Sequence, residues 1–410
     1  MKWLIGFNDL DVEQRAFLTG NNMFPGLVER LKNEHIEGFP GSGKTILLMY
    51  AIAFIKEQNK DAKILFIEFT HSLIKMIQAA LKELVYNEQR VPTDDINVVT
   101  YYDFVNHSSA QDHYDYILCD EVQDVPNRVL NKMKTLADRV LLAGDHNQSI
   151  YEKDPMWGLK PCTQSDIKSL IDPRITALNI MHRLCKSVVN AINAFIPGMN
   201  IMSGKVPMVR KNVQIRLWKA ANQLQEVEYI MKDAQETIDI ADSVAILLPT
   251  HNKIKKFAQY ALKNAGKPAW EEQYDEHHNP NYKSLNKHLK DNDIPMHVVA
   301  NGYGDFMDKS NLIVLTTYHS SKGLDFDKVF MPFCNHTDEH SKYDEASQRL
   351  FMVAMTRSRK DLIISYSFMM DKFVAKFREQ CQLKTLGDNM PSIFDVGNNN
   401  DGDDGDDLFK

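Results

Sequence analysis

The chain of 410 residues is long enough for two or three domains, and its 43% hydrophobic and 25% charged residues are typical of a globular protein. No apolar run approaches the roughly 18 residues of a membrane-spanning helix, which argues against a membrane protein. The five cysteines are scattered and never form a CxxC pair, which argues against a disulfide framework or a zinc knuckle. We therefore expect a cytoplasmic protein with reduced thiols.

The net charge of −7 is concentrated at one end of the chain. From Gly387 onward the sequence contains seven aspartates and one lysine, so this segment carries −6 and the rest of the chain is near neutral. Its Asp-, Gly- and Asn-rich composition predicts a disordered acidic tail. A nucleic-acid groove on the rest of the chain would have to be a local basic patch.

In the first half of the chain, short apolar runs alternate with stretches of helical period. The predicted strands are residues 63–69, 96–100, 114–120 and 139–144, and the helical stretches include residues 45–58 and 71–84. This alternation is typical of a doubly wound α/β domain with a parallel sheet.

Proline and glycine residues between Lys153 and Pro173 separate this series from a second one. The second series of strands is predicted at residues 175–180, 213–218, 243–249, 294–300, 312–317, 328–332 and 361–367. We therefore predict two α/β domains in tandem.

The segment GFPGSGKT, Gly38 to Thr45, fits the pattern G-x-x-x-x-G-K-[ST] of a phosphate-binding loop. In such a loop, backbone N–H groups surround phosphate oxygens, the lysine neutralises the outer phosphates and the final hydroxyl ligates Mg²⁺. The residues predicted to bind ATP and Mg²⁺ here are Gly41, Ser42, Gly43, Lys44 and Thr45.

An acidic motif, YDYILCDEVQD, ends the strand predicted at residues 114–120. Asp120 is predicted to hold Mg²⁺ and Glu121 to orient and deprotonate the attacking water, which is the division of labour that phosphoryl transfer requires. A surface turn with solvated acids is the competing interpretation. The phosphate loop upstream, in a βαβ context, disfavours it.

The octet GDHNQSIY, Gly144 to Tyr151, follows directly on the apolar run of residues 140–143. Open α/β sheets bind their ligands in the crevice beyond the carboxyl ends of the strands. Polar residues at the end of a buried strand therefore predict that this octet contacts a ligand.

These motifs resemble, in order, those of superfamily 1 helicases of the UvrD/Rep type, over roughly Leu10 to Tyr366. The resemblance implies an α/β fold of two tandem RecA-like P-loop domains with parallel sheets, and ATP in the cleft between them. We therefore expect a first domain at residues 1–172 and a second domain with two arginine fingers at 173–386, followed by the acidic tail that the composition predicts at 387–410.

The resemblance also assigns residues around the nucleotide. Gln14 would read the adenine edge, and Gln148 would sense the γ-phosphate and couple it to nucleic acid. Arg183 and Arg357 would reach the γ-phosphate from the second domain. The further residues that the resemblance places near the nucleotide are Gly323 and Asp325, in HSSKGLDFD.

Single-stranded nucleic acid is the second ligand that the resemblance implies. The residues expected to contact it lie in FIEFTHSLIKMI, VVTYYDFV and TTYHSSKGLDFD, and the segment from His319 to Lys322 is expected near the strand. They are Phe69, Thr70, His71, Tyr101 and His319.

Three features depart from the family pattern. Ile46 and His182 stand where the family has an arginine and a tyrosine that sandwich adenine, so base selectivity is expected to be weak. The segment EKDPMWG replaces the residues that stack on a base, with Trp157 as either a substitute or a core residue. The spacers that would hold the two accessory domains are short, so both domains are expected to be missing.

We therefore expect an ATP-hydrolysing translocase on single-stranded nucleic acid, DNA in preference to RNA, that moves 3′ to 5′. One alternative is an ATPase switch that licenses a nuclease or recombination partner without unwinding, and another is a P-loop ATPase unrelated to nucleic acid. The acidic tail is expected to solubilise the chain, to compete with nucleic acid or to dock on a protein partner. No membrane partner is expected.

Overall fold

The structure is a computed structural model that describes residues 4–21, 24–30, 32–207, 213–240, 242–274, 280–300, 311–336 and 344–387. The predicted acidic tail beyond Gly387 lies outside these residues. Within the described ranges, no helix combines the length and the apolar character needed to cross a bilayer.

Helices and strands alternate along most of the described chain, as the sequence pattern predicts. The α-helices are α1 (Val12–Thr19), α2 (Lys44–Gln58), α3 (His71–Glu83), α4 (Tyr101–His107), α5 (Asn127–Leu136), α6 (Gln164–Leu170), α7 (Lys186–Phe195), α8 (Gln223–Asp239), α9 (His251–Asn264), α10 (Tyr282–Asp291), α11 (Glu345–Met355) and α12 (Lys372–Phe377). The strands of the two large sheets are β3 (Glu34–Gly38), β4 (Ile64–Glu68), β7 (Asn97–Thr100), β8 (Tyr114–Cys119), β9 (Ala137–Gly144), β10 (Arg174–Leu178), β11 (Gln214–Lys219), β12 (Val244–Leu248), β13 (Met296–Val298), β14 (Ile313–Thr317), β15 (Phe326–Met331), β16 (Ser358–Tyr366) and β17 (Gln382–Thr385). Two short antiparallel pairs are formed by β1 (Gly20–Asn21) with β2 (Phe24–Pro25) and by β5 (Val85–Tyr86) with β6 (Gln89–Arg90).

The first large sheet has the strand order β10-β3-β9-β8-β4-β7, and every neighbouring pair is parallel. The four strands predicted in the first series all belong to it. The apolar helix α2 is buried on nearly all sides against this sheet, as expected of a helix without a polar face. The prediction of a doubly wound parallel sheet is confirmed.

Strand β10 also belongs to the first sheet, so its assignment to the second series of strands is wrong. It pairs in register with β3, from Arg174 opposite Glu34 to Leu178 opposite Gly38. Its first four side chains alternate between half-buried and exposed, which is typical of an edge strand, and only Leu178 at its end is buried. The proline- and glycine-rich stretch before it is a long connection within one sheet.

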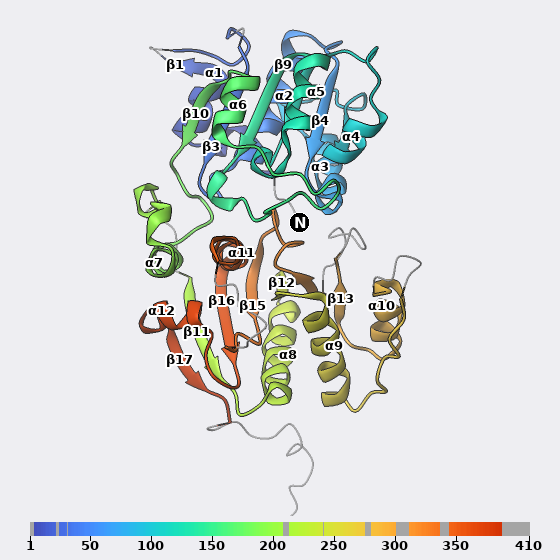
Figure 1. Cartoon of the computed structure of the whole chain (residues 1–410), viewed down its shortest axis with the longest axis vertical. Coiled ribbons are helices and arrows are strands. Elements are labelled where there is room, and N and C mark those ends of the chain that lie inside the picture. The colour runs from blue at the N-terminus through green and yellow to red at the C-terminus, as the bar shows by residue number, and fades with distance from the viewer. Residues whose placement is uncertain are drawn as a thin grey trace, which may run out of the picture.

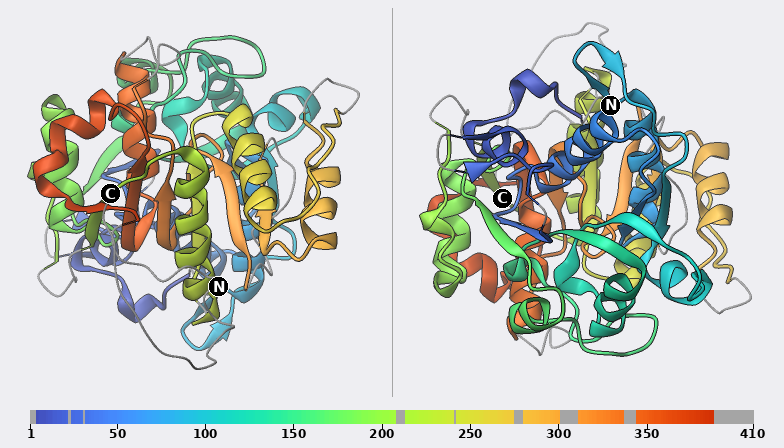
Figure 2. Two further views of the ribbon diagram at one scale, coloured as in Figure 1. Left: turned by 90° about the horizontal axis from the view of Figure 1, so that it is seen from below. Right: turned by 90° about the horizontal axis from the view of Figure 1, so that it is seen from above.

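The second large sheet has the order β13-β14-β12-β15-β16-β11-β17 and is also parallel throughout. The edge strand β17 was not predicted because all four of its residues are exposed and carry no apolar alternation. Two α/β units are stacked along the long axis of the molecule, with the first sheet above and the second below (Figure 1). Helix α10 lies on one side, with α7 and α12 on the opposite side, in both views of Figure 2. The structure therefore has the predicted architecture of two tandem RecA-like domains.

Candidate active site

The phosphate loop, Gly38 to Thr45, connects β3 to α2 at the carboxyl edge of the first sheet. Gly41 and Gly43 adopt positive φ angles of 72° and 85°. A Cβ atom at Gly41 would lie 2.4 Å from Cβ of Arg183, and one at Gly43 would lie 2.3 Å from Nε2 of Gln14. Both positions therefore require glycine, for backbone conformation and for space.

Polar groups at the start of α2 fit a phosphate ligand. The Ser42 hydroxyl is buried and has no hydrogen-bond partner among the described residues. The Lys44 ammonium donates to the carbonyl oxygens of Gly38 (2.8 Å) and Phe39 (3.3 Å). Burial lowers the pKa of Lys44, and nearby carboxylates oppose that shift. A cation, an unpaired hydroxyl and a helix N-terminus thus meet at the loop, as phosphate binding requires.

Thr45 and Asp120 provide oxygen ligands suited to Mg²⁺. The Thr45 hydroxyl donates a hydrogen bond of 2.5 Å to Oδ2 of Asp120, and the backbone N–H of Glu121 donates to Oδ1 over 2.9 Å. Burial and the neighbouring Glu121 charge raise the pKa of Asp120 to about 6. A divalent cation at this position would favour the ionised carboxylate.

Glu121 follows directly, with a left-handed backbone at φ 51°. Its Oε2 atom accepts a hydrogen bond from Nε2 of Gln123 over 2.5 Å and lies 3.4 Å from Nζ of Lys322. Burial acts to raise the pKa of Glu121, but the positive charges of Lys322 and Lys44 outweigh it and lower the pKa to about 2. Glu121 is therefore ionised at neutral pH.

Lys322 links the two sheets at this point. It lies in the segment between β14 and β15 of the second sheet and is only 2% exposed. Its Nζ atom forms an ion pair with Asp124 and donates to the backbone oxygen of Gln148 over 3.0 Å. The segment containing Lys322 was expected near nucleic acid, but its ammonium group contacts Glu121 and Asp124 of the acidic motif.

Gln148 is buried inside its own loop. Its Nε2 atom donates to Oδ2 of Asp145 over 3.0 Å, and the backbone N–H of Asp145 donates to Oε1 of Gln123 over 3.0 Å. The octet after β9 is thus joined by hydrogen bonds to the acidic motif after β8. This contact gives a physical route between the octet and Glu121.

The two predicted arginine fingers converge on one carbonyl group. Nη1 of Arg183 and Nη1 of Arg357 both donate to the backbone oxygen of Leu324, over 3.4 Å and 3.1 Å. Arg357 is 1% exposed and also donates to the Val353 carbonyl and the Thr356 hydroxyl. Arg183 lies between β10 of the first sheet and α7, so it does not come from the second sheet.

Gln14 is held by hydrogen bonds to the phosphate loop and to Asp11. Its Nε2 atom donates to the Ser42 carbonyl over 2.9 Å, and its Oε1 atom accepts from the backbone N–H of Asp11 over 3.0 Å. His182 contacts Asp11, with 2.5 Å between Nε2 and Oδ2. Gln14 therefore lies against the phosphate loop, where the resemblance places it, but its amide is engaged within the protein.

Gly323 and Asp325 have different surroundings. A Cβ atom on Gly323 would lie 2.4 Å from Cδ1 of Leu73, so this glycine allows close packing against α3. Asp325 lies 4.0 Å from Arg183 and 3.7 Å from Arg359. Asp325 is thus beside the predicted arginine fingers, whereas Gly323 faces a helix of the first domain.

Two aromatic residues predicted to contact nucleic acid pack against each other. The rings of Phe69 and Tyr101 are stacked, with centroids 4.8 Å apart, and the residues are 6% and 2% exposed. Tyr151 packs on Phe69 at 5.0 Å, and His319 packs on Tyr151 at 5.6 Å. The structure brings three predicted contact residues into one cluster, with the rings of Phe69 and Tyr101 facing inward.

Trp157 extends this cluster at its edge. Its ring lies 5.3 Å from that of Tyr102, and the Arg128 guanidinium lies 5.1 Å from its centroid. The buried carboxylate of Asp154 fixes the loop by accepting the backbone N–H groups of Trp157 and Leu159. Trp157 is half-buried, so it combines core packing with a partly accessible ring.

Glu68 is a buried acid that the sequence analysis missed. Its Oε1 atom accepts the backbone N–H groups of Phe69 (2.9 Å) and Thr70 (3.4 Å), so it organises the predicted nucleic-acid segment. Burial, followed by the charges of Asp120 and Glu121, raises the pKa of Glu68 well above its ordinary value. The signal in the sequence that could have identified Glu68 is an acidic residue at the end of an otherwise apolar strand, β4. His71 begins α3, but its side chain lies outside the described ones.

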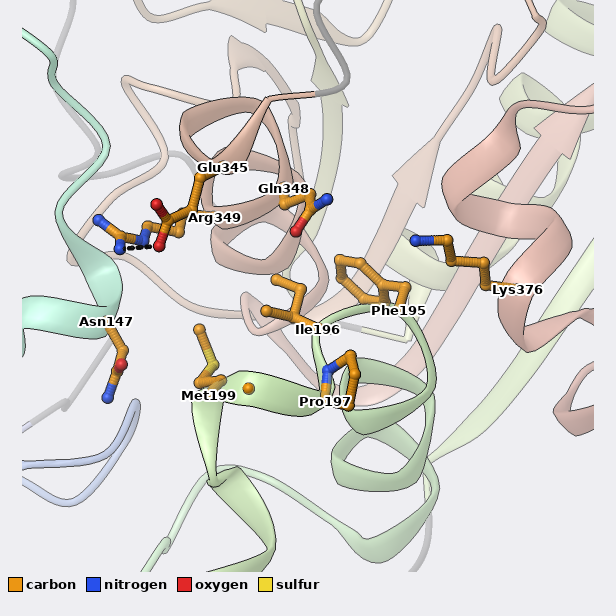
Figure 3. Close-up of a pocket in the computed structure, with 10 residues that line it drawn as sticks. Asn147, Phe195, Ile196, Pro197, Met199, Glu345, Gln348, Arg349 and Lys376 are labelled. Atoms are coloured by element: carbon orange, nitrogen blue, oxygen red, sulfur yellow. Dashed lines mark hydrogen bonds and ion pairs between the residues drawn. The ribbon is translucent and has the colours of Figure 1, made fainter.

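A separate pocket of about 390 Å³ opens between the octet, the end of α7 and α11. Apolar residues from the end of α7 and the turn after it lie on one side, and an ion pair between Glu345 and Arg349 lies on the other (Figure 3). Among the residues that line this pocket, Asn147 alone belongs to a segment predicted to contact a ligand, the octet after β9. The lining residues are Asn147, Phe195, Ile196, Pro197, Gly198, Met199, Glu345, Gln348, Arg349 and Lys376.

The fold and the phosphate loop define a P-loop protein of the nucleotide-hydrolysing class. Residues 30–154 match the AAA domain family, and residues 269–368 match the UvrD-like helicase C-terminal domain family. These two matches confirm the resemblance to UvrD-like helicases of superfamily 1 that is seen in the motifs. A comparison with curated proteins gave no match.

Solved helicase structures also resemble the chain. The helicase nonstructural protein 10 of an arterivirus has a TM-score of 0.42 and 15% identity, with 84% of this chain and 61% of that chain covered. Its complex with DNA gives 0.43 and 15%, covering 84% and 63%. The PRRSV helicase gives 0.42 and 15%, covering 82% and 53%. The chain thus spans less than two thirds of these proteins.

Proposed function

We propose that this protein is an ATP-dependent translocase on single-stranded nucleic acid, with DNA preferred over RNA and movement from 3′ to 5′. The observation that carries the ATPase proposal is the convergence of Arg183 and Arg357 on Leu324, next to the phosphate loop and the acidic motif. Transition-state charge on a transferred phosphoryl group requires such cations opposite a phosphate-binding loop.

In this proposal, the backbone of the phosphate loop, Ser42 and Lys44 bind the phosphates of ATP. Thr45 and Asp120 would hold Mg²⁺, which supplies charge neutralisation at the β- and γ-phosphates when bound. Glu121 accepts a proton from the attacking water. The residues proposed to bind the rest of the nucleotide or to respond to it are Gln14, Gln148, Arg183, Gly323, Asp325 and Arg357.

The two α/β units would open and close around the nucleotide and thereby step the strand. Arg357 enters from the second unit, so the full set of cations forms only when the units are in contact. We place the first unit at residues 1–178, because β10 belongs to the first sheet. The nucleic-acid contacts are proposed for the cluster of Phe69, Tyr101 and His319.

A second candidate function is favoured by the inward stacking of Phe69 and Tyr101. Rings that bind successive bases must offer an accessible face, and these two rings cover each other. The protein would then be a nucleic-acid-stimulated ATPase switch that controls a nuclease or recombination partner, without movement of its own.

ATP hydrolysis measured with and without single-stranded DNA or RNA, combined with a translocation assay on labelled DNA, tests both candidates. Strong stimulation with directional movement supports the translocase. Stimulation without movement supports the switch. If neither DNA nor RNA changes the rate of ATP hydrolysis, both candidate functions are contradicted, and the protein is a P-loop ATPase with another partner.

A further inference from the structure

The ammonium group of Lys322 makes three polar contacts with described residues, and all three partners belong to the first unit. Its Nζ atom lies 3.4 Å from Oε2 of Glu121, forms an ion pair with Asp124 and donates to the backbone oxygen of Gln148. At 2% exposure, this ammonium group is removed from water and depends on these partners for its solvation. Its position is therefore tightly defined.

The contacts of Lys322 restrict one particular oxygen of Glu121. Gln123 donates to Oε2 over 2.5 Å, and Lys322 approaches the same Oε2 atom. Both partners hold the carboxylate by one edge. These two contacts to Oε2 also fix the orientation of the other oxygen, Oε1. The left-handed backbone of Glu121 fixes the position of its Cβ atom.

Asp124 forms an ion pair with the same ammonium group. It is fully buried, and it belongs to the same acidic motif as Glu121. Because Asp124 and Glu121 flank the same cation, Lys322 maintains the spacing between the two acids. The Gln148 carbonyl is a third partner of the ammonium group and connects it to the octet after β9.

We propose that Lys322 is a positioning residue for ATP hydrolysis: it reaches across from the second unit and fixes the Glu121 carboxylate so that Oε1 accepts the proton of the attacking water. This inference rests on the proposed ATPase function. It makes the orientation of the base depend on contact between the two units. Nucleotide binding by the phosphate loop does not require Lys322.

The first test is Lys322→Met, which keeps the length of the side chain and removes its charge. The expected result is a fall in kcat of at least about 30-fold, with KM for ATP changed by less than about threefold, since a misdirected base weakens only the transition state. Lys322→Arg should restore part of kcat. Loss of ATP affinity with unchanged kcat would overturn the proposal.

A double-variant cycle separates positioning from a general structural role. If Lys322 acts through Glu121, adding Lys322→Met to Glu121→Gln should produce little further loss of kcat. If the two losses multiply, Lys322 does not act through Glu121 and the proposal is wrong.

Folding is controlled by two further variants. Lys322→Met leaves Asp124 as a buried unpaired charge, so Lys322→Met with Asp124→Asn removes both charges together. This pair should fold and still show the loss of kcat, and recovery of kcat in it would overturn the proposal. The matched control is Lys328→Met, because Lys328 pairs with Asp233 inside the second unit and should leave kcat unchanged.

All variants are measured with and without single-stranded DNA. Wild-type hydrolysis that does not respond to DNA would contradict the proposed translocase while the Lys322 comparison is still decided on basal turnover. Normal kcat in folded Lys322→Met, beside a wild type that DNA stimulates, would overturn the positioning role alone.

Discussion

The Thr45 hydroxyl donates a hydrogen bond of 2.5 Å to Oδ2 of Asp120 and so joins the phosphate loop to the end of β8. Both groups offer an oxygen atom as a metal ligand, and Mg²⁺ prefers oxygen ligands. The two residues are far apart in the sequence and meet because β3, β9 and β8 are neighbours in one parallel sheet. This relationship sets where the metal and the attacking water would lie.

Replacing Asp120 with asparagine should therefore raise the Mg²⁺ concentration needed for half-maximal ATP hydrolysis by at least about tenfold, because a charged oxygen ligand is lost. Thr45→Ala should shift the same midpoint less. Magnesium titrations of steady-state hydrolysis measure both effects, and chelation of the metal should abolish turnover in the wild type. Identical midpoints for all three proteins would argue against this metal site.

Glu121→Gln should still bind ATP but hydrolyse it at least about 10²-fold more slowly, which is the scale of a lost general base. Lys44→Ala should instead lose ATP binding, because the cation beside the phosphates is removed. A fluorescent ATP analogue reports binding, and phosphate release reports turnover. Near-normal turnover in Glu121→Gln would remove the assignment of Glu121 as the base.

Arg357→Ala and Arg183→Ala should each lower kcat far more than nucleotide affinity, since both side chains are proposed to act on transition-state charge. Arg357 is 1% exposed, so its variant also needs a measured unfolding midpoint. Arg216→Ala is a useful comparison, because Arg216 pairs with Asp233 and Asp361 inside the second unit. Parallel losses of affinity and kcat in the first two variants would contradict the finger role.

Gln148→Ala should weaken the stimulation of hydrolysis by single-stranded DNA while leaving basal turnover largely intact. The side chain bonds Asp145, whose backbone bonds Gln123 beside the proposed base, so its removal loosens the link between the octet and that base. The measured quantity is the ratio of stimulated to basal kcat. An unchanged ratio would show that Gln148 does not couple the two ligands.

Acid should destabilise the protein through His35. Burial, followed by the charges of His146 and Lys44, lowers the pKa of His35 to about 4, from an ordinary value of 6.5. Between these values the unfolded chain binds more protons than the folded one, so the free energy of unfolding falls as pH drops from about 6.5 toward 4.

His35→Gln should flatten this dependence between pH 7 and pH 5, as measured by urea unfolding. The exposed His113, paired with Asp138, gives the control variant His113→Gln. Equal slopes for His35→Gln and the wild type would show that His35 does not carry the effect.

Much of the fold could be predicted from the sequence because its elements are marked locally. The apolar runs that became β4, β8 and β9, and the glycine pattern between β3 and α2, carry their own periodicity and turn chemistry. The order of the motifs was enough to assign the UvrD-like class. Strand β10 could not be assigned to a sheet, because the residue pattern of an edge strand does not indicate which sheet it pairs with.

The sequence by itself determined the phosphate loop, the acidic pair at Asp120 and Glu121, and the two tandem parallel sheets. Only the tertiary structure decided that Lys322 faces Glu121, that Phe69 and Tyr101 cover each other, and that Arg183 follows a strand of the first sheet. The physical reason is that the backbone conformation of a strand, helix or turn depends mainly on residues close together in the sequence. The partner of a buried charge or ring is chosen instead by packing between segments more than a hundred residues apart, such as those of Lys322 and Asp124.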